Sequence, residues 1–393
     1  MHRRAFLSIM GAGATGGRAA EIGRFRGSGG RTTVPVRMVD HRVMVPVRIG
    51  GETYEFLLAS GAHTVVSREL ARELELKVAG DYAVRGTGEA PVRIARTVVS
   101  GMSIGELEVA RMELGVAPLE EMRRAIGFQR LDGVLGYEFF REFVVGIEAS
   151  VEQLHLVRSG DFEYEGGGTT VELAGEVPEV EAEIDGVRGR FRVDTGDRAA
   201  VTWNAPFVAA RELRKRFEPH SFGICGWGLG GPVRADWSRG ERLRFGGFEV
   251  KPVWMRFPRT QNGAFADGRV AGSLGNALWS RFNVWIDVPG RRMILEPWTA
   301  LDAADVYEGA GFWMSEGSEG FEVVEVAAGG AAERAGLEAG DVVTMVEGRA
   351  AAGLELTEVR HWTRRPAGLG MRVRKPNGAW RDVRVAARRG DWI

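Results

Sequence analysis

Cysteine and lysine are scarce in this chain of 393 residues, and each scarcity limits what the protein can be. The single cysteine, Cys225, excludes a disulfide within the chain and a cysteine-based structural zinc site. We expect it to be a small buried apolar residue. Only 4 of the 52 basic residues are lysine, which is typical of coding bias in a GC-rich genome rather than of an arginine-based binding surface.

Excess charge is absent as well. The net charge of -1 gives no footprint for nucleic acid or for an anionic membrane. The six histidines show no metal-ligand spacing, so we expect no metal and no cofactor, and we take His63 as a surface or turn residue. The hydrophobic content of 44% supplies ample core, and the length predicts two or three domains.

Long apolar runs are missing, and the N-terminus has only a short one. Arg3 and Arg4 precede the mildly apolar residues 5–10, and small residues follow at 12–14. This order resembles a twin-arginine export signal, although a Gly-rich leader with a chance arginine pair remains the alternative. The run is too short to span a bilayer, and no other segment favours a membrane span. We therefore expect residues 1–33 to be a signal and flexible segment of a protein exported to the periplasm or outside the cell.

The stretch Phe191–Asp197 is the most informative in the chain. An apolar strand runs into Asp194, Thr195 and Gly196. Glycine allows a tight turn after the strand, and the hydroxyl can bond locally to hold it. The carboxylate is thereby presented at a fixed point. An upstream stretch, Phe56–Ala62, has the same apolar run, hydroxyl and glycine, but Ala59 stands where the aspartate would be, followed by Ser60 and Gly61.

A second marker follows each motif at nearly the same spacing. An apolar pair precedes Gly136, which lies 77 positions after Ala59, and the matching stretch 270–275 ends at Gly275, which lies 81 positions after Asp194. Equal spacing of two markers indicates an internal duplication. Alternating residues at 43–49 and 54–58 predict a strand hairpin, and residues 67–76 have helical spacing with Ser67 as N-cap.

These motifs resemble the aspartic peptidases, specifically the bilobal bacterial kind whose two retropepsin-like lobes each supply one Asp-Thr/Ser-Gly. The resemblance implies a mainly β fold with two homologous β-barrel lobes, at 34–165 and 166–300, around a central cleft. A peptide or protein substrate would bind in that cleft. Both lobes lie in one chain, so a homodimer is not required.

In the family, two aspartates share one proton, since like charges so close cannot both ionise. One draws a proton from a water molecule, and the other donates to the peptide carbonyl. Asp194 can fill one role and Ala59 neither, which costs about a hundred- to ten-thousand-fold in rate. We therefore expect little or no peptidase activity. The supporting positions of the two motifs are Ser60, Gly61, Thr195 and Gly196.

Glycine pairs mark two hairpins that should fold over the cleft as mobile flaps. They lie at Gly86, Thr87 and Gly88 in lobe one and at Gly226, Trp227 and Gly228 in lobe two. Ordinary surface hairpins are the alternative. Trp227 is either a substrate contact or a partly covered aromatic residue.

The character of the chain changes after Pro297. A short helix at Ala331–Leu337 and a Gly340-Asp341 turn resemble the bacterial PDZ module, which we expect at 305–390. Residues 356–362 would line its groove. The module binds a peptide C-terminus by adding it as a strand, with backbone amides holding the carboxylate. The loop for that carboxylate would comprise Gly309, Ala310, Gly311 and Phe312.

Three interpretations of the broken motif remain open. The chain is an aspartic endopeptidase with one inactivating change, or a pseudopeptidase that binds peptides through its cleft and PDZ groove, or an enzyme in which another acid such as Asp197 substitutes. For Asp197, pairing with an arginine or capping the following turn is the more ordinary role. A purely structural envelope protein fits poorly with two glycine-rich flaps.

Overall fold

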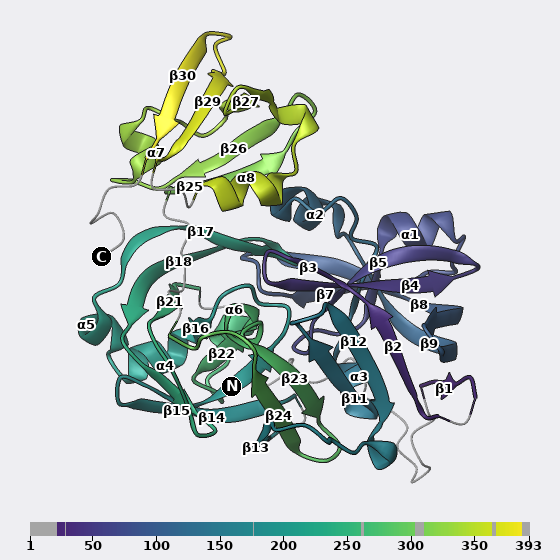
Figure 1. The fold of residues 1–393 in the computed structure, drawn as a ribbon. Helices are drawn as coiled ribbons and strands as arrows, with labels where there is room; N and C mark the ends of the chain where they lie inside the picture. Colours follow the sequence, from purple (N-terminus) through teal and green to yellow (C-terminus); the bar gives the residue numbers. More distant parts are fainter. Residues whose placement is uncertain are drawn as a thin grey trace, which may run out of the picture.

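The computed structural model describes residues 22–27, 29–175, 177–260, 263–302, 310–363 and 367–386. It is mainly β, which confirms the predicted fold class, and its sheets form two lobes with a smaller C-terminal unit above them (Figure 1). No helix in the described part of the chain is long and apolar enough to cross a membrane. Of the predicted leader, residues 1–21 lie outside the described ranges.

Lobe one is built on a sheet whose strands follow the order β1-β9-β6-β10-β5-β4-β8-β7, with β3 beside β4. The strands are β1 (Arg24–Phe25), β3 (Arg37–Val39), β4 (Arg42–Ile49), β5 (Glu52–Leu58), β6 (Val65–Ser67), β7 (Ala79–Arg85), β8 (Pro91–Ile104), β9 (Leu107–Ala117) and β10 (Gly133–Leu135). The helices are α1 (Arg68–Glu73), α2 (Glu120–Ile126) and α3 (Tyr137–Glu142). Ser67 caps α1 as predicted, because its side chain accepts from the Leu70 amide.

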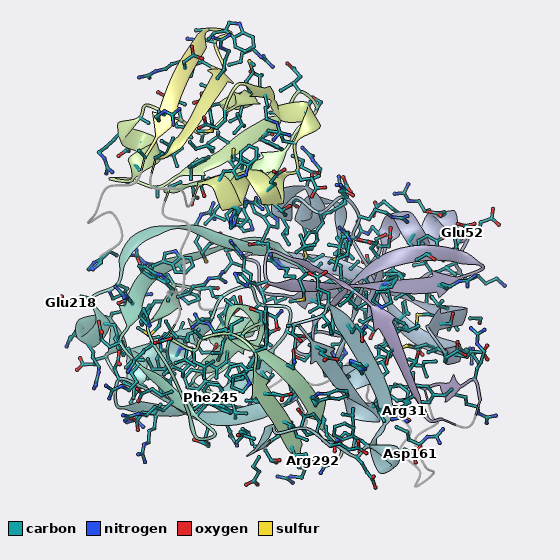
Figure 2. The ribbon with its side chains drawn as sticks, in the orientation of Figure 1. Arg31, Glu52, Asp161, Glu218, Phe245 and Arg292 are labelled. Carbon is teal, nitrogen blue, oxygen red and sulfur yellow. The ribbon has the colours of Figure 1, made fainter. Side chains whose placement is uncertain are left out.

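Lobe two follows the order β17-β18-β21-β16-β22-β15-β14-β19-β20. The strands are β14 (Glu179–Ile184), β15 (Val187–Asp194), β16 (Val201–Trp203), β17 (His220–Gly228), β18 (Gly231–Gly240), β19 (Leu243–Phe245), β20 (Phe248–Val250), β21 (Val253–Pro258) and β22 (Gly272–Gly275). The helices are α4 (Ala205–Ala210), α5 (Leu213–Phe217) and α6 (Asn276–Trp279), with a 3-10 turn at Ala264–Ala266. Glu218, at the end of α5, lies on the outer side of this lobe (Figure 2).

The two sheets share one pairing scheme. In lobe one, β10 runs parallel to β5 and antiparallel to β6, and β6 runs parallel to β9. In lobe two, β22 runs parallel to β15 and antiparallel to β16, and β16 runs parallel to β21. The repeated markers predict such a duplication. Each marker glycine directly follows or ends the strand beside its motif, so both motifs occupy equivalent places.

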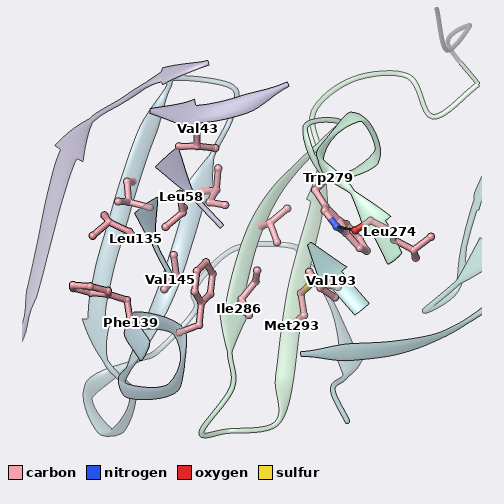
Figure 3. Close-up of a cluster of buried hydrophobic side chains, with 14 of the residues drawn as sticks. Val43, Leu58, Leu135, Phe139, Val145, Val193, Leu274, Trp279, Ile286 and Met293 are labelled. Atoms are coloured by element: carbon pink, nitrogen blue, oxygen red, sulfur yellow. Dashed lines mark hydrogen bonds between the residues drawn. The ribbon is translucent and has the colours of Figure 1, made fainter. Parts of the chain in front are cut away.

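A third sheet joins the lobes. Its order is β13-β24-β23-β11-β12-β2, comprising β2 (Arg31–Pro35), β11 (Phe143–Glu148), β12 (Gln153–Arg158), β13 (Thr169–Glu172), β23 (Phe282–Asp287) and β24 (Arg292–Pro297), with a 3-10 turn at Ser159–Asp161. Strand β11 of lobe one pairs with β23 of lobe two, placing Val145 opposite Ile286. One buried cluster therefore runs through both lobes, with Leu58 and Leu135 on one side and Val193 and Leu274 on the other (Figure 3).

The predicted end of the flexible leader at residue 33 is wrong. Strand β1 pairs with β9, and β2 pairs with β12 along Arg31–Pro35. Thr32 and Val34 are buried in alternation, and the Thr32 hydroxyl accepts from the Glu106 amide at 2.9 Å. Glycine and arginine around these residues hide the strand in the sequence, and only its partner strands reveal it.

The C-terminal unit has a sheet and core of its own. The strands follow the order β25-β26-β27-β29-β30, with β28 beside β27, and comprise β25 (Phe312–Glu316), β26 (Phe321–Val326), β27 (Val342–Val346), β28 (Arg349–Ala350), β29 (Leu369–Arg374) and β30 (Trp380–Val385). The helices are α7 (Ala331–Arg334) and α8 (Leu356–Trp362), with a 3-10 turn at Ala351–Gly353. Of the predicted carboxylate loop, Gly309 lies outside the described residues, whereas Ala310, Gly311 and Phe312 lead into β25.

Candidate active site

The two motifs meet at the boundary between the lobes through hydrogen bonds between their second residues. The Ser60 amide donates to the Thr195 hydroxyl at 3.0 Å, and the Thr195 amide donates to the Ser60 hydroxyl at 3.1 Å. The Ser60 hydroxyl donates to the Val193 carbonyl at 2.6 Å, and the Thr195 hydroxyl donates to the Leu58 carbonyl at 3.2 Å. Both side chains are fully buried. These reciprocal hydrogen bonds fix the positions of the residues that flank Ser60 and Thr195 in the two motifs.

Position 59 and Asp194 face each other across these bonds. A Cβ atom built on Gly196 would lie 2.7 Å from the Ala59 Cβ, and one built on Gly61 would lie 3.1 Å from an Asp194 carboxylate oxygen. Each glycine thus permits close approach of the opposite motif's first residue. Ala59 is held in place by its amide, which donates to the Leu135 carbonyl at 2.9 Å. A side chain at position 59 therefore emerges beside Asp194.

Of these two facing positions, only position 194 carries a carboxylate. One of its oxygens accepts from the Gly196 amide at 2.9 Å. Burial, with a smaller contribution from the charge of Asp197, raises the pKa of Asp194 to about 6, although the amides of Gly196 and Asp197 oppose the shift. A carboxyl with this pKa can exchange a proton in weakly acidic solution, which suits an acid or base but supplies only one of the two roles.

The Asp197 carboxylate is hydrogen-bonded to other residues of lobe two. Its carboxylate accepts from the Arg256 guanidinium at 2.9 Å, from the Thr202 hydroxyl at 2.7 Å and from the Ala199 amide at 3.0 Å. Both Asp197 and Arg256 have almost fully buried side chains. Asp197 therefore pairs with an arginine and caps the following turn, which is the more ordinary of the two roles predicted for it. All of these partners are structural.

The two flap hairpins touch each other at their tips. The Gly88 amide donates to the Leu229 carbonyl at 3.1 Å, and the Ala90 amide donates to the Gly230 carbonyl at 2.9 Å. Gly86 and Thr87 lie in the turn between β7 and β8. Gly226, Trp227 and Gly228 end strand β17, so the tip of the second hairpin is Leu229–Gly230 rather than these residues.

Close approach explains the glycines of the flaps. A Cβ on Gly228 would lie 1.7 Å from the Thr87 hydroxyl oxygen, and a Cβ on Gly88 would lie 2.3 Å from the Gly230 carbonyl carbon. Trp227 and Leu229 pack against the apolar cluster that includes Ala59. The second flap therefore packs against an apolar cluster of lobe one, and Trp227 is a partly covered aromatic residue.

A buried cluster of arginines lies beside the motifs and was not predicted. Arg42 donates to Asp40 at 3.0 Å, and Arg198 contacts the same carboxylate at 2.9 Å. Burial alone would raise the pKa of Asp40, but Arg198 and Arg42 hold it well below its usual range. Arginine is so abundant in this sequence that no local signal separates these residues from exposed ones. Their contribution is structural, because they tie the start of β4 to the loop after Asp194.

The structure also shows the surroundings of His63 and Cys225. His63 is half-exposed and contacts the Glu138 carboxylate at 2.8 Å, as a turn histidine would. Cys225 is buried, as predicted, and burial raises the pKa of its thiol to about 11. Among the residues described, no group of three or more His, Cys, Asp or Glu is arranged to hold a metal ion.

Two segments of the chain match known protein families. Residues 45–139 match the family described as aspartyl protease, and residues 322–368 match a family described as PDZ domain. The chain carries an aspartyl protease domain and a PDZ domain. The first match lies within the lobe whose motif holds Ala59, and the second lies within the C-terminal unit.

A solved structure also resembles the chain. The crystal structure of aspartic proteinase from Irpex lacteus matches 70% of this chain and 99% of its own, with 16% identity and a TM-score of 0.45. No curated protein matches the sequence. The two matched segments identify the two domains, and the relation of lobe two to lobe one rests on their common strand pairing.

Proposed function

We propose that the interlobe site is an aspartic endopeptidase site that lacks one of its two carboxylates. It binds an extended peptide between the lobes under the two flaps. With Ala59 in place, hydrolysis is absent or severely impaired, because one carboxyl cannot act both as base toward water and as acid toward the carbonyl.

The reciprocal bonding of Ser60 and Thr195 is the observation that supports this proposal most strongly. These bonds lie next to the first residue of each motif, and neither of them involves the side chain at position 59. The site differs from a carboxylate pair only in the carboxyl group that the Ala59 side chain lacks. The raised pKa of Asp194, about 6, fits an acid that works in weakly acidic solution.

The alternative is a pseudopeptidase that binds peptides without cutting them. The packing of Trp227 and Leu229 against the cluster around Ala59 favours it, since apolar contacts there suit binding more than water activation. In this case the interlobe site and the PDZ groove would both act as peptide-binding surfaces of a regulatory protein.

Cleavage of a defined peptide mixture at pH 4 to 6 separates the two. The chains to compare are the native protein, Ala59→Asp, and Ala59→Asp combined with Asp194→Asn, with products identified by mass spectrometry. We expect cleavage by Ala59→Asp alone. Peptide binding by all three chains without cleavage by any would overturn the peptidase proposal in favour of the alternative.

We also propose that the protein is exported, on the basis of Arg3 and Arg4 before the short apolar stretch. Replacing both arginines with lysine should retain the protein inside the cell, and fractionation of a bacterial host measures this. Equal export of both chains would contradict the proposal.

A further inference from the structure

The PDZ domain rests on the peptidase lobes through β25 and α8. These two elements form the side of the domain that faces α2 and β17 (Figure 1). Trp313 of β25 and Arg360 of α8 are both 4% exposed, and the guanidinium lies 4.2 Å from the centre of the indole ring. A buried arginine needs acceptors, and those found here come largely from the other domain.

The end of helix α2 supplies these acceptors. Arg360 donates to the carbonyls of Ala125 and Ile126, and also to the Met314 carbonyl of β25 at 2.5 Å. The Trp313 indole donates to the Ala125 carbonyl at 3.1 Å. The last carbonyls of a helix lack partners within it and carry partial negative charge, so a buried cation is stabilised there. The end of α2 thus lies between β25 and α8.

Contacts around this point are close. A Cβ built on Gly127, which ends α2 with φ of 83°, would lie 2.6 Å from the Leu356 Cβ of α8. Arg124 donates to the Glu316 carbonyl at the end of β25 at 2.9 Å, and Arg123 pairs with the Glu316 carboxylate at 2.9 Å. Position 127 therefore tolerates no side chain while the domains are docked.

The same domain also contacts the flap of lobe two. Trp227 stacks on Trp313 with ring centres 6.5 Å apart. The Glu325 carboxylate of β26 accepts from the Ile224 amide at 2.7 Å and from Arg234 at 2.6 Å. Because this flap bonds to the tip of the first flap, the PDZ domain is linked to both.

We propose that the peptide groove of the PDZ domain, between β25 and α8, is occupied by the end of α2, and that this contact holds the flaps closed. A peptide with an apolar C-terminal residue and a free carboxylate enters by adding as a strand beside β25, and so displaces α2 and Trp227. Peptide binding and flap closure therefore oppose each other, and each weakens the other by the same factor. This coupling does not require the interlobe site to be catalytic.

The test uses the full chain and a variant that weakens docking without changing any side chain of β25 or α8. Arg124→Ala combined with Glu325→Gln removes contacts to β25 and to the flap. The matched control, Arg372→Ala with Asp382→Asn, removes an exposed arginine–carboxylate pair on the β29–β30 hairpin of the same domain. The probe is a fluorescent hexapeptide ending in Leu-Val with a free carboxylate, compared with its C-terminal amide.

Two readouts decide the outcome. We expect the docking variant to bind the acid peptide at least fivefold more tightly than the native and control chains, since less of it is closed. We also expect the acid peptide, but not the amide, to speed amide hydrogen exchange in residues 223–231 of the native chain. Equal affinities with unchanged exchange, or no binding of the acid peptide to any chain, would overturn the proposal.

Discussion

Burial raises the pKa of Asp194 to about 6, against 3.8 for an unperturbed aspartate, and this single residue links the site to pH. Between these values the folded chain holds more protons than the unfolded chain. The contribution of the neutral carboxyl to stability is therefore fully present below about pH 4 and is lost as the pH rises through 6.

Asp194→Asn should remove this dependence. The unfolding free energy of the native chain, measured relative to the variant, should fall by roughly 2 kcal/mol between pH 4 and pH 7. Urea unfolding of both chains across this range measures the difference. A constant difference between the two chains would mean that Asp194 titrates in the folded protein as it does in water.

Asp197 shows how an acidic residue near a site can be structural. Removing its side chain in Asp197→Ala leaves Arg256 buried with a lost partner, which should cost about 3–5 kcal/mol. Denaturant unfolding measures this loss. Glu249→Ala, which removes an exposed partner of Lys251 and Arg244, is the control and should cost far less, because water screens exposed ion pairs. Equal losses in the two variants would refute the structural role.

At the scale of elements, the two motif turns hold the lobes together through Ser60 and Thr195. Ser60→Ala deprives the Thr195 amide of its acceptor and the Val193 carbonyl of a donor, both buried, so we expect a loss of roughly 2–4 kcal/mol. Combining it with Thr195→Val should cost less than the sum of the two single changes, because they share partners. Strict additivity in chemical denaturation would show that the bonds do not act as one unit.

Elements with a strong local pattern could be predicted from the sequence. The alternation at 43–49 and 54–58 gives β4 and β5, and Ser67 caps α1, because each depends on neighbours along the chain. Strand β2 was missed, since its pattern is short and its stability comes from β12. Helices α4 and α5 were also missed.

The candidate site divides in the same way. Ser60 and Thr195 were found because each motif is continuous in sequence. The pair of Asp40 with Arg198 joins residues 158 positions apart, and Arg360 meets α2 across 234 positions. Contacts of this kind depend on how the lobes and the PDZ domain pack, which periodicity and local composition do not encode.

At the scale of the whole molecule, the lobes share one sheet and one core, whereas the PDZ domain has a core of its own. The pairing of β11 with β23 fixes the lobes relative to each other, so positions 59 and 194 face each other as parts of a single body. The PDZ domain instead contacts the lobes through hydrogen bonds, an ion pair and ring contacts with α2, β17 and β18, such as those of Arg360, Trp313 and Glu325.

The titration of Asp194 tests most directly whether position 59 is the missing half of a carboxylate pair. Carbon-13 NMR of aspartate carboxyls, with Asp194→Asn for assignment, should show one step near pH 6 in the native chain. In Ala59→Asp the account predicts two coupled steps, one below and one above that value, because neighbouring carboxyls resist double ionisation. An Asp194 titration that is unchanged in Ala59→Asp would place the two positions too far apart to form a pair and would contradict the account.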